Sequence, residues 1–212
     1  MIKINKRPLP DNVTIKQEKD YREGIVFKML TEDCNNKCYI CEDSPHTAPN
    51  VEHRVSHRNN PALKFDWNNL FLACHHCNNT KLDKYDGIID PTNVDPEKFI
   101  KLSLDFDEEL RKVVVVRKVN GGGDVDVTAS LLNAVYNGVN TDIKKYACRQ
   151  LRNKLNNELL EFRKILDSYK ASPCDSSMTA VKNRLHDKSI FAAFKREIVR
   201  NDPELHKQFI AQ

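Results

Sequence analysis

Hydrophobic residues recur at spacings of three and four beyond residue 129, which is the pattern of helices with one apolar face. The polar segment 172–177 interrupts this pattern, and further helices are predicted around 178–186 and 189–199 and after Pro203. The second half of the chain is therefore expected to be mainly α-helical. The longest apolar stripe consists of Leu151, Leu155, Leu159, Phe162, Leu166 and Tyr169.

The first half of the chain has shorter and less regular patterns. Residues 1–20 are expected to form an extended polar arm, because Pro8 and Pro10 disfavour helix. Hydrophobic positions near helical spacing predict a short helix at about 21–32. Prolines and polar clusters between 42 and 66 favour loops and short strands.

A second strand signal lies in the middle of the chain, after a turn-rich segment at 86–96 that is expected to be a linker. The β-branched run VVVVRKV at 113–119 is followed by Asn-Gly-Gly-Gly and then by the alternating run DVDVT at 124–128. Two such runs around a glycine turn predict a β-hairpin. The expected fold class is therefore α+β.

Composition indicates the cellular compartment of the protein but says little about its function. The chain has 212 residues with 34 Lys and Arg, 30 Asp and Glu, and seven cysteines. No apolar run approaches the roughly 20 residues that span a bilayer, and no apolar stretch follows the basic N-terminus as in a secretory signal. We therefore expect a cytoplasmic protein without membrane partners, whose cysteines are metal ligands or buried thiols. A net charge of +4 is too small to indicate nucleic-acid binding by itself.

Four of the cysteines form two CxxC pairs, Cys38–Cys41 and Cys74–Cys77. Two such pairs supply the four thiolates that tetrahedral zinc prefers, so we predict one structural zinc. A redox pair or ordinary buried cysteines are the alternatives, and Cys34 is a possible substitute for Cys38. The pairs are separated by residues 42–73, which is more than a simple zinc ribbon needs and leaves room for a site of its own.

Residues 42–73 and the segments on either side contain polar residues suited to phosphate chemistry. Glu52 and His53 are adjacent, Asn69 precedes the second pair, and Asn78 and Lys81 follow it. A neutral histidine can take a proton from water, and carboxylate and amide oxygens can hold a hard divalent cation. Taken singly, each residue has an ordinary explanation as surface or turn. Their placement around two cysteine pairs favours the catalytic interpretation.

This order of motifs, NVEHRVSH…FDWNNLFLACHHCNNTK, resembles the HNH endonuclease family and its ββα-metal fold over about residues 34–85. The resemblance implies that His53 is the general base, and that Glu52 and Asn78 hold a catalytic Mg or Mn ion. It implies that Asn69 pins the loop of the hairpin and that Lys81 lies near the substrate phosphate. The implied activity is hydrolysis of phosphodiester bonds in DNA, or in RNA such as tRNA.

The family often continues acid-His-Ile-x-Pro, whereas Arg54, Val55 and Ser56 follow His53 in this chain. His57 is therefore a second candidate, either as a phosphate contact or as a rival base. The missing proline also leaves an alternative open, in which the protein is an inactive zinc-containing adaptor that binds nucleic acid or another protein.

The whole layout is similar to the HNH subunit of Septu-type and retron-linked anti-phage systems. That resemblance implies a partner ATPase related to the SMC and ABC proteins, and a reverse transcriptase with its DNA–RNA product. We expect an N-terminal arm and helix at 1–33, a zinc-braced nuclease core at 34–90, and a hairpin with helices at 91–212. The cations in 142–170 outnumber the acids, which indicates a solvated helix face or a surface for phosphate or a partner.

Overall fold

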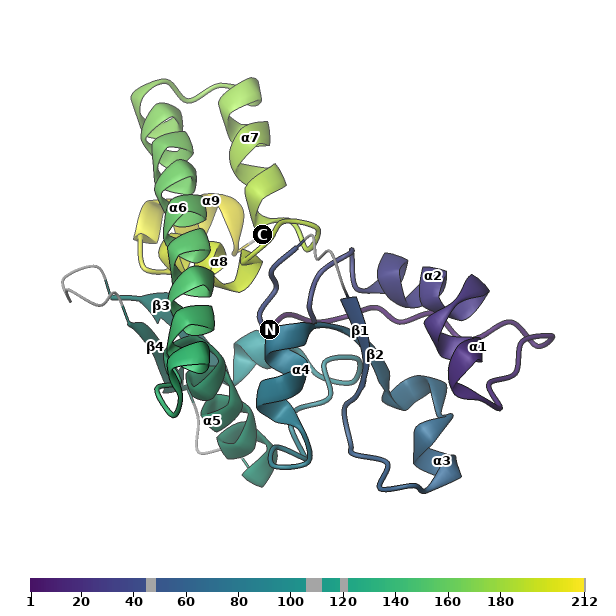
Figure 1. Ribbon diagram of the computed structural model, residues 1–212. Helices are drawn as coiled ribbons and strands as arrows, with labels where there is room; N and C mark the ends of the chain where they lie inside the picture. Colours follow the sequence, from purple (N-terminus) through teal and green to yellow (C-terminus); the bar gives the residue numbers. More distant parts are fainter. Residues whose placement is uncertain (45–48, 106–111, 119–121, 212) are drawn as a thin grey trace.

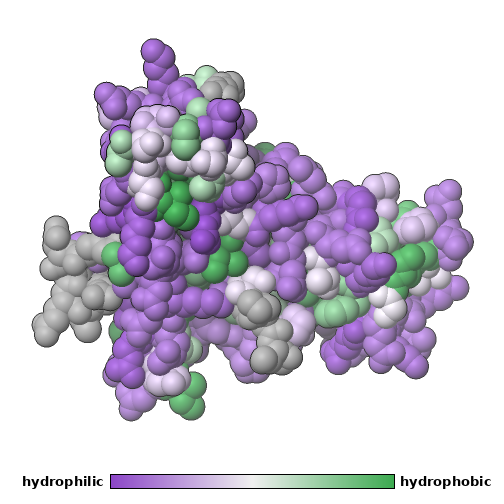
Figure 2. Space-filling model, turned by 90° about the horizontal axis from the view of Figure 1, so that it is seen from above, coloured by the Kyte–Doolittle hydropathy of each residue, from purple (hydrophilic) through white to green (hydrophobic). Residues whose placement is uncertain are grey.

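The computed structural model describes residues 1–44, 49–105, 112–118 and 122–211, which form an α+β structure with two small antiparallel sheets (Figure 1). None of the helices in these ranges combines the length and hydrophobicity needed to cross a membrane. One face is largely hydrophilic, with small separate hydrophobic patches (Figure 2). The elements are α1 (Glu18–Arg22), α2 (Gly24–Asp33), β1 (Pro49–His53), α3 (Pro61–Lys64), η1 (Trp67–Asn69), β2 (Leu70–Cys74), α4 (His75–Lys81), η2 (Pro96–Lys98), β3 (Ile100–Leu104), β4 (Val113–Arg117), α5 (Gly123–Asn137), α6 (Asp142–Ala171), α7 (Asp175–Leu185), α8 (Ala192–Arg200) and α9 (Pro203–Phe209).

The first sheet and α4 form a compact ββα unit. Strand β1 pairs antiparallel with β2, so that Glu52 lies opposite Phe71 and His53 opposite Leu70. Every residue of β2 is buried, as its continuous apolar sequence requires. Helix α4 starts directly after β2, and the Cys74 side chain caps it by accepting a hydrogen bond from the Cys77 backbone.

The N-terminal arm has a turn at residues 11–12 and ends at Gln17, since α1 begins at Glu18 within the range expected to be extended, and the arm is not simply polar. Met1, Ile2 and Ile4 are buried in the core cluster that also contains the paired cysteines. The Lys6 ammonium lies 4.1 Å from the Trp67 ring centre and donates to the Leu70 carbonyl at 2.6 Å. The expectation of a polar arm is corrected in this respect, because the scattered apolar residues bind the arm to the ββα unit.

The predicted hairpin of 113–119 with 124–128 is wrong. Strand β4 pairs instead with β3, and the DVDVT run lies in the first turns of α5. Two acids in the first helical turn favour this start, and Val125, Thr128 and Leu132 form its buried face at helical spacing. Part of the expected turn, residues 119–121, lies outside the described residues.

The predicted helices of the second half are confirmed. Helix α6 buries Leu151, Leu155, Leu159, Phe162 and Leu166 along one face. Helices α7, α8 and α9 follow it and pack around it and the second sheet (Figure 1). Residues from the arm, the ββα unit and the helices share one hydrophobic cluster, so the ββα unit rests on the helical half.

Candidate functional site

The four paired cysteines form one buried cluster. The sulfur atoms of Cys38, Cys41, Cys74 and Cys77 all lie within 4.8 Å of one another, and none is in a disulfide. This arrangement is compatible with a structural zinc ion. Cys34 is buried but lies outside the cluster. His76, which directly precedes Cys77, is also outside it, and its ring bonds the Val135 carbonyl at 2.8 Å. Within the described ranges, no other group of three His, Cys, Asp or Glu side chains is placed to hold a metal.

A second site is a cavity of about 480 Å³ beside the end of β1. Four of the predicted residues line it, namely Glu52, His53, His57 and Asn78. They come from three separate segments, since β1 and the loop after it supply three and α4 supplies the fourth. The fold therefore gathers the acid, both histidines and the last asparagine of the motif around one space.

The His53 ring is fixed in one tautomer by the last residue of α3, in the segment between β1 and β2. Its Nε2 atom lies 2.9 Å from the Lys64 carbonyl oxygen, and a carbonyl can only accept, so Nε2 carries the hydrogen. In the neutral ring Nδ1 then holds the free lone pair. Burial lowers the pKa of His53 from its ordinary value of 6.5, although the hydrogen bond to Lys64 opposes the shift. His53 is therefore neutral at pH 7 and has one basic nitrogen.

His57 has the opposite hydrogen-bonding arrangement. Its Nδ1 atom accepts a hydrogen bond from the Asn59 backbone at 3.0 Å, so the neutral ring carries its hydrogen on Nε2. The two imidazole rings lie 4.7 Å apart between centres. The remaining nitrogen of His57 is thus a donor suited to an anionic oxygen, which favours the phosphate contact over the rival base.

Asn69 holds the loop that positions His53. Its side chain accepts from the Val55 backbone at 2.8 Å and donates to the Val55 and Leu63 carbonyls at 2.8 and 3.0 Å. Leu63 directly precedes Lys64, whose carbonyl orients the His53 ring. Asn69 therefore acts at a distance from the cavity as a positioning residue for His53.

Replacing Asn69 with alanine is expected to lower the free energy of unfolding by about 3 kcal/mol, because three partly buried backbone groups of Val55 and Leu63 lose their partners, each at the low end of roughly 1–3 kcal/mol. Urea denaturation followed by circular dichroism measures this change. Asn68→Ala is the matched control, since Asn68 is exposed and contributes its backbone N–H, not its side chain, to the Asp66 cap. Equal stability of the two variants would contradict the role given to Asn69.

Glu52 is engaged in an internal network. One carboxylate oxygen lies 2.8 Å from the Lys81 ammonium, and the other accepts from the Tyr39 hydroxyl at 2.5 Å. Burial raises the pKa of Glu52 to about 7, while the charge of Lys81 opposes the shift. Glu52 thus forms part of the cavity wall with its charge compensated from inside the protein.

Lys81 is placed differently from the expectation. Its side chain is 0% exposed, and its ammonium contacts Glu52 and donates to the His53 and Leu82 carbonyls. A substrate phosphate would have to enter the core to reach it. The structure therefore corrects the predicted phosphate contact to an internal counter-ion of Glu52.

Two exposed cations, rather than Lys81, line this cavity. Arg22 from α1 and Arg58 from the loop after His57 line it, and their side chains are 64% and 70% exposed. Tyr21 completes the α1 wall, with its ring edge-on to His53 at 5.7 Å between centres. No motif identifies Arg22 or Tyr21 in the sequence, because α1 reaches the cavity only through tertiary packing.

Comparisons with protein-family models, with curated proteins and with solved structures find no match to this chain.

Proposed function

We propose that the protein is a metal-dependent HNH endonuclease that hydrolyses phosphodiester bonds in nucleic acid. The observation that carries this proposal is the state of His53, a neutral imidazole with its basic nitrogen free, on the wall of a cavity that Glu52 and Asn78 share. A general base needs a free lone pair near neutral pH and a fixed orientation. The Lys64 carbonyl and the Asn69 side chain give His53 that orientation.

In this mechanism His53 accepts a proton from water through Nδ1, and the water oxygen attacks the phosphorus as the bond from phosphorus to the leaving oxygen breaks. The leaving oxygen takes a proton from solvent, and His53 returns its proton to solvent. Arg22, Arg58 and the Nε2 hydrogen of His57 bind the phosphate oxygens at the cavity mouth. Asn78 and Glu52 would hold a Mg or Mn ion, which stabilises charge on the phosphate and the leaving oxygen when bound. Each oxygen of Glu52 keeps a second acceptor position beside its bonds to Lys81 and Tyr39.

We propose that the cysteine cluster holds a structural zinc, which ties the two parts of the site together. Cys74 ends β2, and Cys77 directly precedes Asn78 on α4. Cys38 and Cys41 lie before β1, and Cys74 lies opposite Pro49, so the cluster joins the start of β1 to the end of β2 and the first turn of α4. A rigid support of this kind fixes catalytic side chains to within a fraction of an ångström.

The test compares two neighbouring amides on α4. Asn78 lines the cavity, whereas the exposed side chain of Asn79 bonds His75 at 2.7 Å. Asn78→Ala is expected to reduce Mg- or Mn-dependent cleavage of plasmid DNA and of tRNA by at least the roughly 10- to 100-fold typical of weakened metal sites. Asn79→Ala is expected to cleave normally, and equal activities would contradict the metal site.

The second candidate is an inactive adaptor that keeps zinc and binds nucleic acid or a partner protein. It is favoured by the Glu52–Lys81 pair, because a metal-binding carboxylate loses much of its attraction for a cation beside a buried ammonium. An adaptor would retain zinc in metal analysis but show no Mg- or Mn-dependent cleavage at any protein concentration.

We further propose that the nuclease is the toxic subunit of an anti-phage system controlled by an ATPase related to the SMC and ABC proteins. The similarity of the layout to Septu-type and retron-linked HNH subunits supports this role. Co-expression with an ATPase or reverse transcriptase encoded next to it, followed by co-purification, tests the association.

A further inference from the structure

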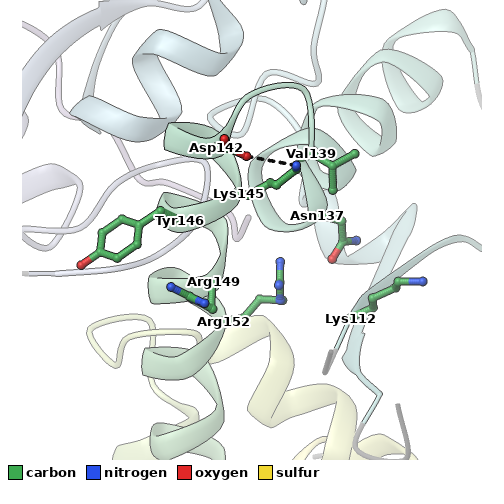
Figure 3. Close-up of a pocket in the computed structure, with 9 residues that line it drawn as sticks. Lys112, Asn137, Val139, Asp142, Lys145, Tyr146, Arg149 and Arg152 are labelled. Carbon is green, nitrogen blue, oxygen red and sulfur yellow. Dashed lines mark hydrogen bonds and ion pairs between the residues drawn. The ribbon is translucent and has the colours of Figure 1, made fainter. Parts of the chain in front are cut away.

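A second cavity, of about 600 Å³, lies where α5 meets α6 and shares no lining residue with the cavity of His53. Its walls come from the end of α5, the first three turns of α6 and Lys112 before β4 (Figure 3). Nothing in the proposed hydrolysis uses these residues.

The walls of this cavity are strongly cationic. Of the described residues that line it, Lys112, Lys145, Arg149 and Arg152 are cationic and Asp142 alone is acidic, and Asp142 pairs with Lys145 at 3.1 Å. Arg149 and Arg152 leave successive turns of α6, and Lys112 lies across the opening from them (Figure 3). The excess of positive charge favours an anionic ligand.

The rim also exposes an aromatic ring beside a cation. Tyr146 is 58% exposed, and the Arg149 guanidinium lies 5.6 Å from its ring centre. Val139, another lining residue, is 66% exposed. Flat rings stack on nucleobases while neighbouring cations bind the phosphates, and this combination is typical of surfaces for single-stranded nucleic acid. An acidic peptide would use the cations and leave Tyr146 without a stacking partner.

Hydrogen bonds hold the floor of the cavity in place and join it to the ββα unit. Asn137 bonds both the N–H and the carbonyl of Val113, at 3.1 and 2.7 Å. A Cβ on Gly138 would lie 2.6 Å from the Ala134 carbonyl oxygen, so this tight turn requires glycine. His76 on α4 bonds the carbonyl of Val135 in α5, which connects the floor to the helix that carries Asn78.

We propose that this cavity, defined by Tyr146, Lys145 and Arg149, binds an unpaired nucleotide of a single-stranded segment of the nucleic acid. The nucleobase stacks on Tyr146, and its flanking phosphates contact the two cations. A paired base has both faces covered by its neighbours in the stack, so a duplex cannot use Tyr146 in this way. The link to cleavage rests on the proposed endonuclease function, but the binding step does not.

The test measures the affinity of a fluorescent 12-nucleotide single strand by anisotropy, without added divalent metal, in the His53→Ala background. Tyr146→Ala is expected to weaken binding by about 5- to 150-fold, the loss typical of one stacked base, whereas Tyr146→Phe is expected to retain it. Lys145→Gln with Arg149→Gln is expected to reduce the slope of log K against log salt by about 1.4, since each lost phosphate contact contributes roughly 0.7.

The matched control is Lys164→Gln with Lys207→Gln, an equal change of charge at exposed positions outside the cavity. Equal losses in the two double variants, or a duplex that binds as tightly as the single strand, would overturn the proposal. The proposal would also be overturned if an acidic peptide of equal charge displaced the labelled strand as effectively as unlabelled strand does. If the strand binds as expected while His53→Ala still cleaves, the endonuclease mechanism fails and the binding site stands.

Discussion

Replacing Cys77 with serine is expected to remove the proposed zinc ion and to unfold most of the ββα unit. A structural zinc contributes about 10–16 kcal/mol in small zinc domains, which is as large as the whole net stability of a typical protein, about 5–15 kcal/mol. Burial raises the pKa of the Cys41 and Cys77 thiols well above the ordinary range, so without a metal these two sulfurs keep their protons in the core. A loss of only about 5 kcal/mol would lower the melting temperature by roughly 10–20 °C.

Metal analysis and calorimetry measure the two parts of this prediction. The wild-type chain should contain about one zinc, as four thiolates around one ion require, and Cys77→Ser should contain almost none. The control is Cys34→Ser, which also places a hydroxyl in the core, since Cys34 is buried but lies outside the cluster. Equal zinc content and equal melting temperatures in both variants would contradict a metal role for the cluster.

Local patterns predicted the parts of the fold that depend on nearest neighbours in sequence. The stripe from Leu151 to Leu166 became one face of α6 because helical spacing alone brings those side chains together. Each CxxC turn brings its own two sulfurs together because only two residues separate them, and in the folded chain the two pairs share one cluster. The predicted hairpin was wrong because its outcome is not decided locally. The DVDVT run fits either a strand or the start of a helix, and the choice depends on the packing of Val125 in the core.

The sequence predicted most residues of the candidate site, but not their burial or their hydrogen-bond partners. Glu52, His53 and Asn78 do line one cavity, but the sequence could not reveal that Lys81 is buried against Glu52. From the sequence, a lysine that follows a CxxC pair is expected to be a surface cation, and only the folded structure shows that Lys81 is buried. The same limit applies to the Lys64 carbonyl, because any residue has one, and only the folded loop shows that it orients His53.

Replacing His53 with alanine is expected to reduce cleavage by about 10²–10⁴-fold, the usual contribution of a general base, without loss of zinc. His57→Ala should retain the base and lose only a phosphate donor, so its defect should be smaller. His75→Ala is the matched control, since this exposed ring bonds Asn79 and lies outside the cavity. A His57→Ala variant with the larger defect would assign the base to His57 instead.

The pH dependence of cleavage identifies the titrating group. Burial lowers the pKa of His53 below its ordinary value of 6.5, and electrostatic interactions with His57, Lys81 and Lys64 act in the same direction, while the hydrogen bond to the Lys64 carbonyl opposes the shift. A base is active when deprotonated, so the His53 step should slow as the pH decreases through a midpoint below 6.5. Glu52, whose pKa burial raises to about 7, must also lose its proton to hold the metal, so a separate fall in rate is expected near pH 7. The His57→Ala variant should keep both falls, and residual cleavage by His53→Ala should keep only the one near pH 7. A fall below pH 6.5 that survives in His53→Ala would exclude His53 as the base.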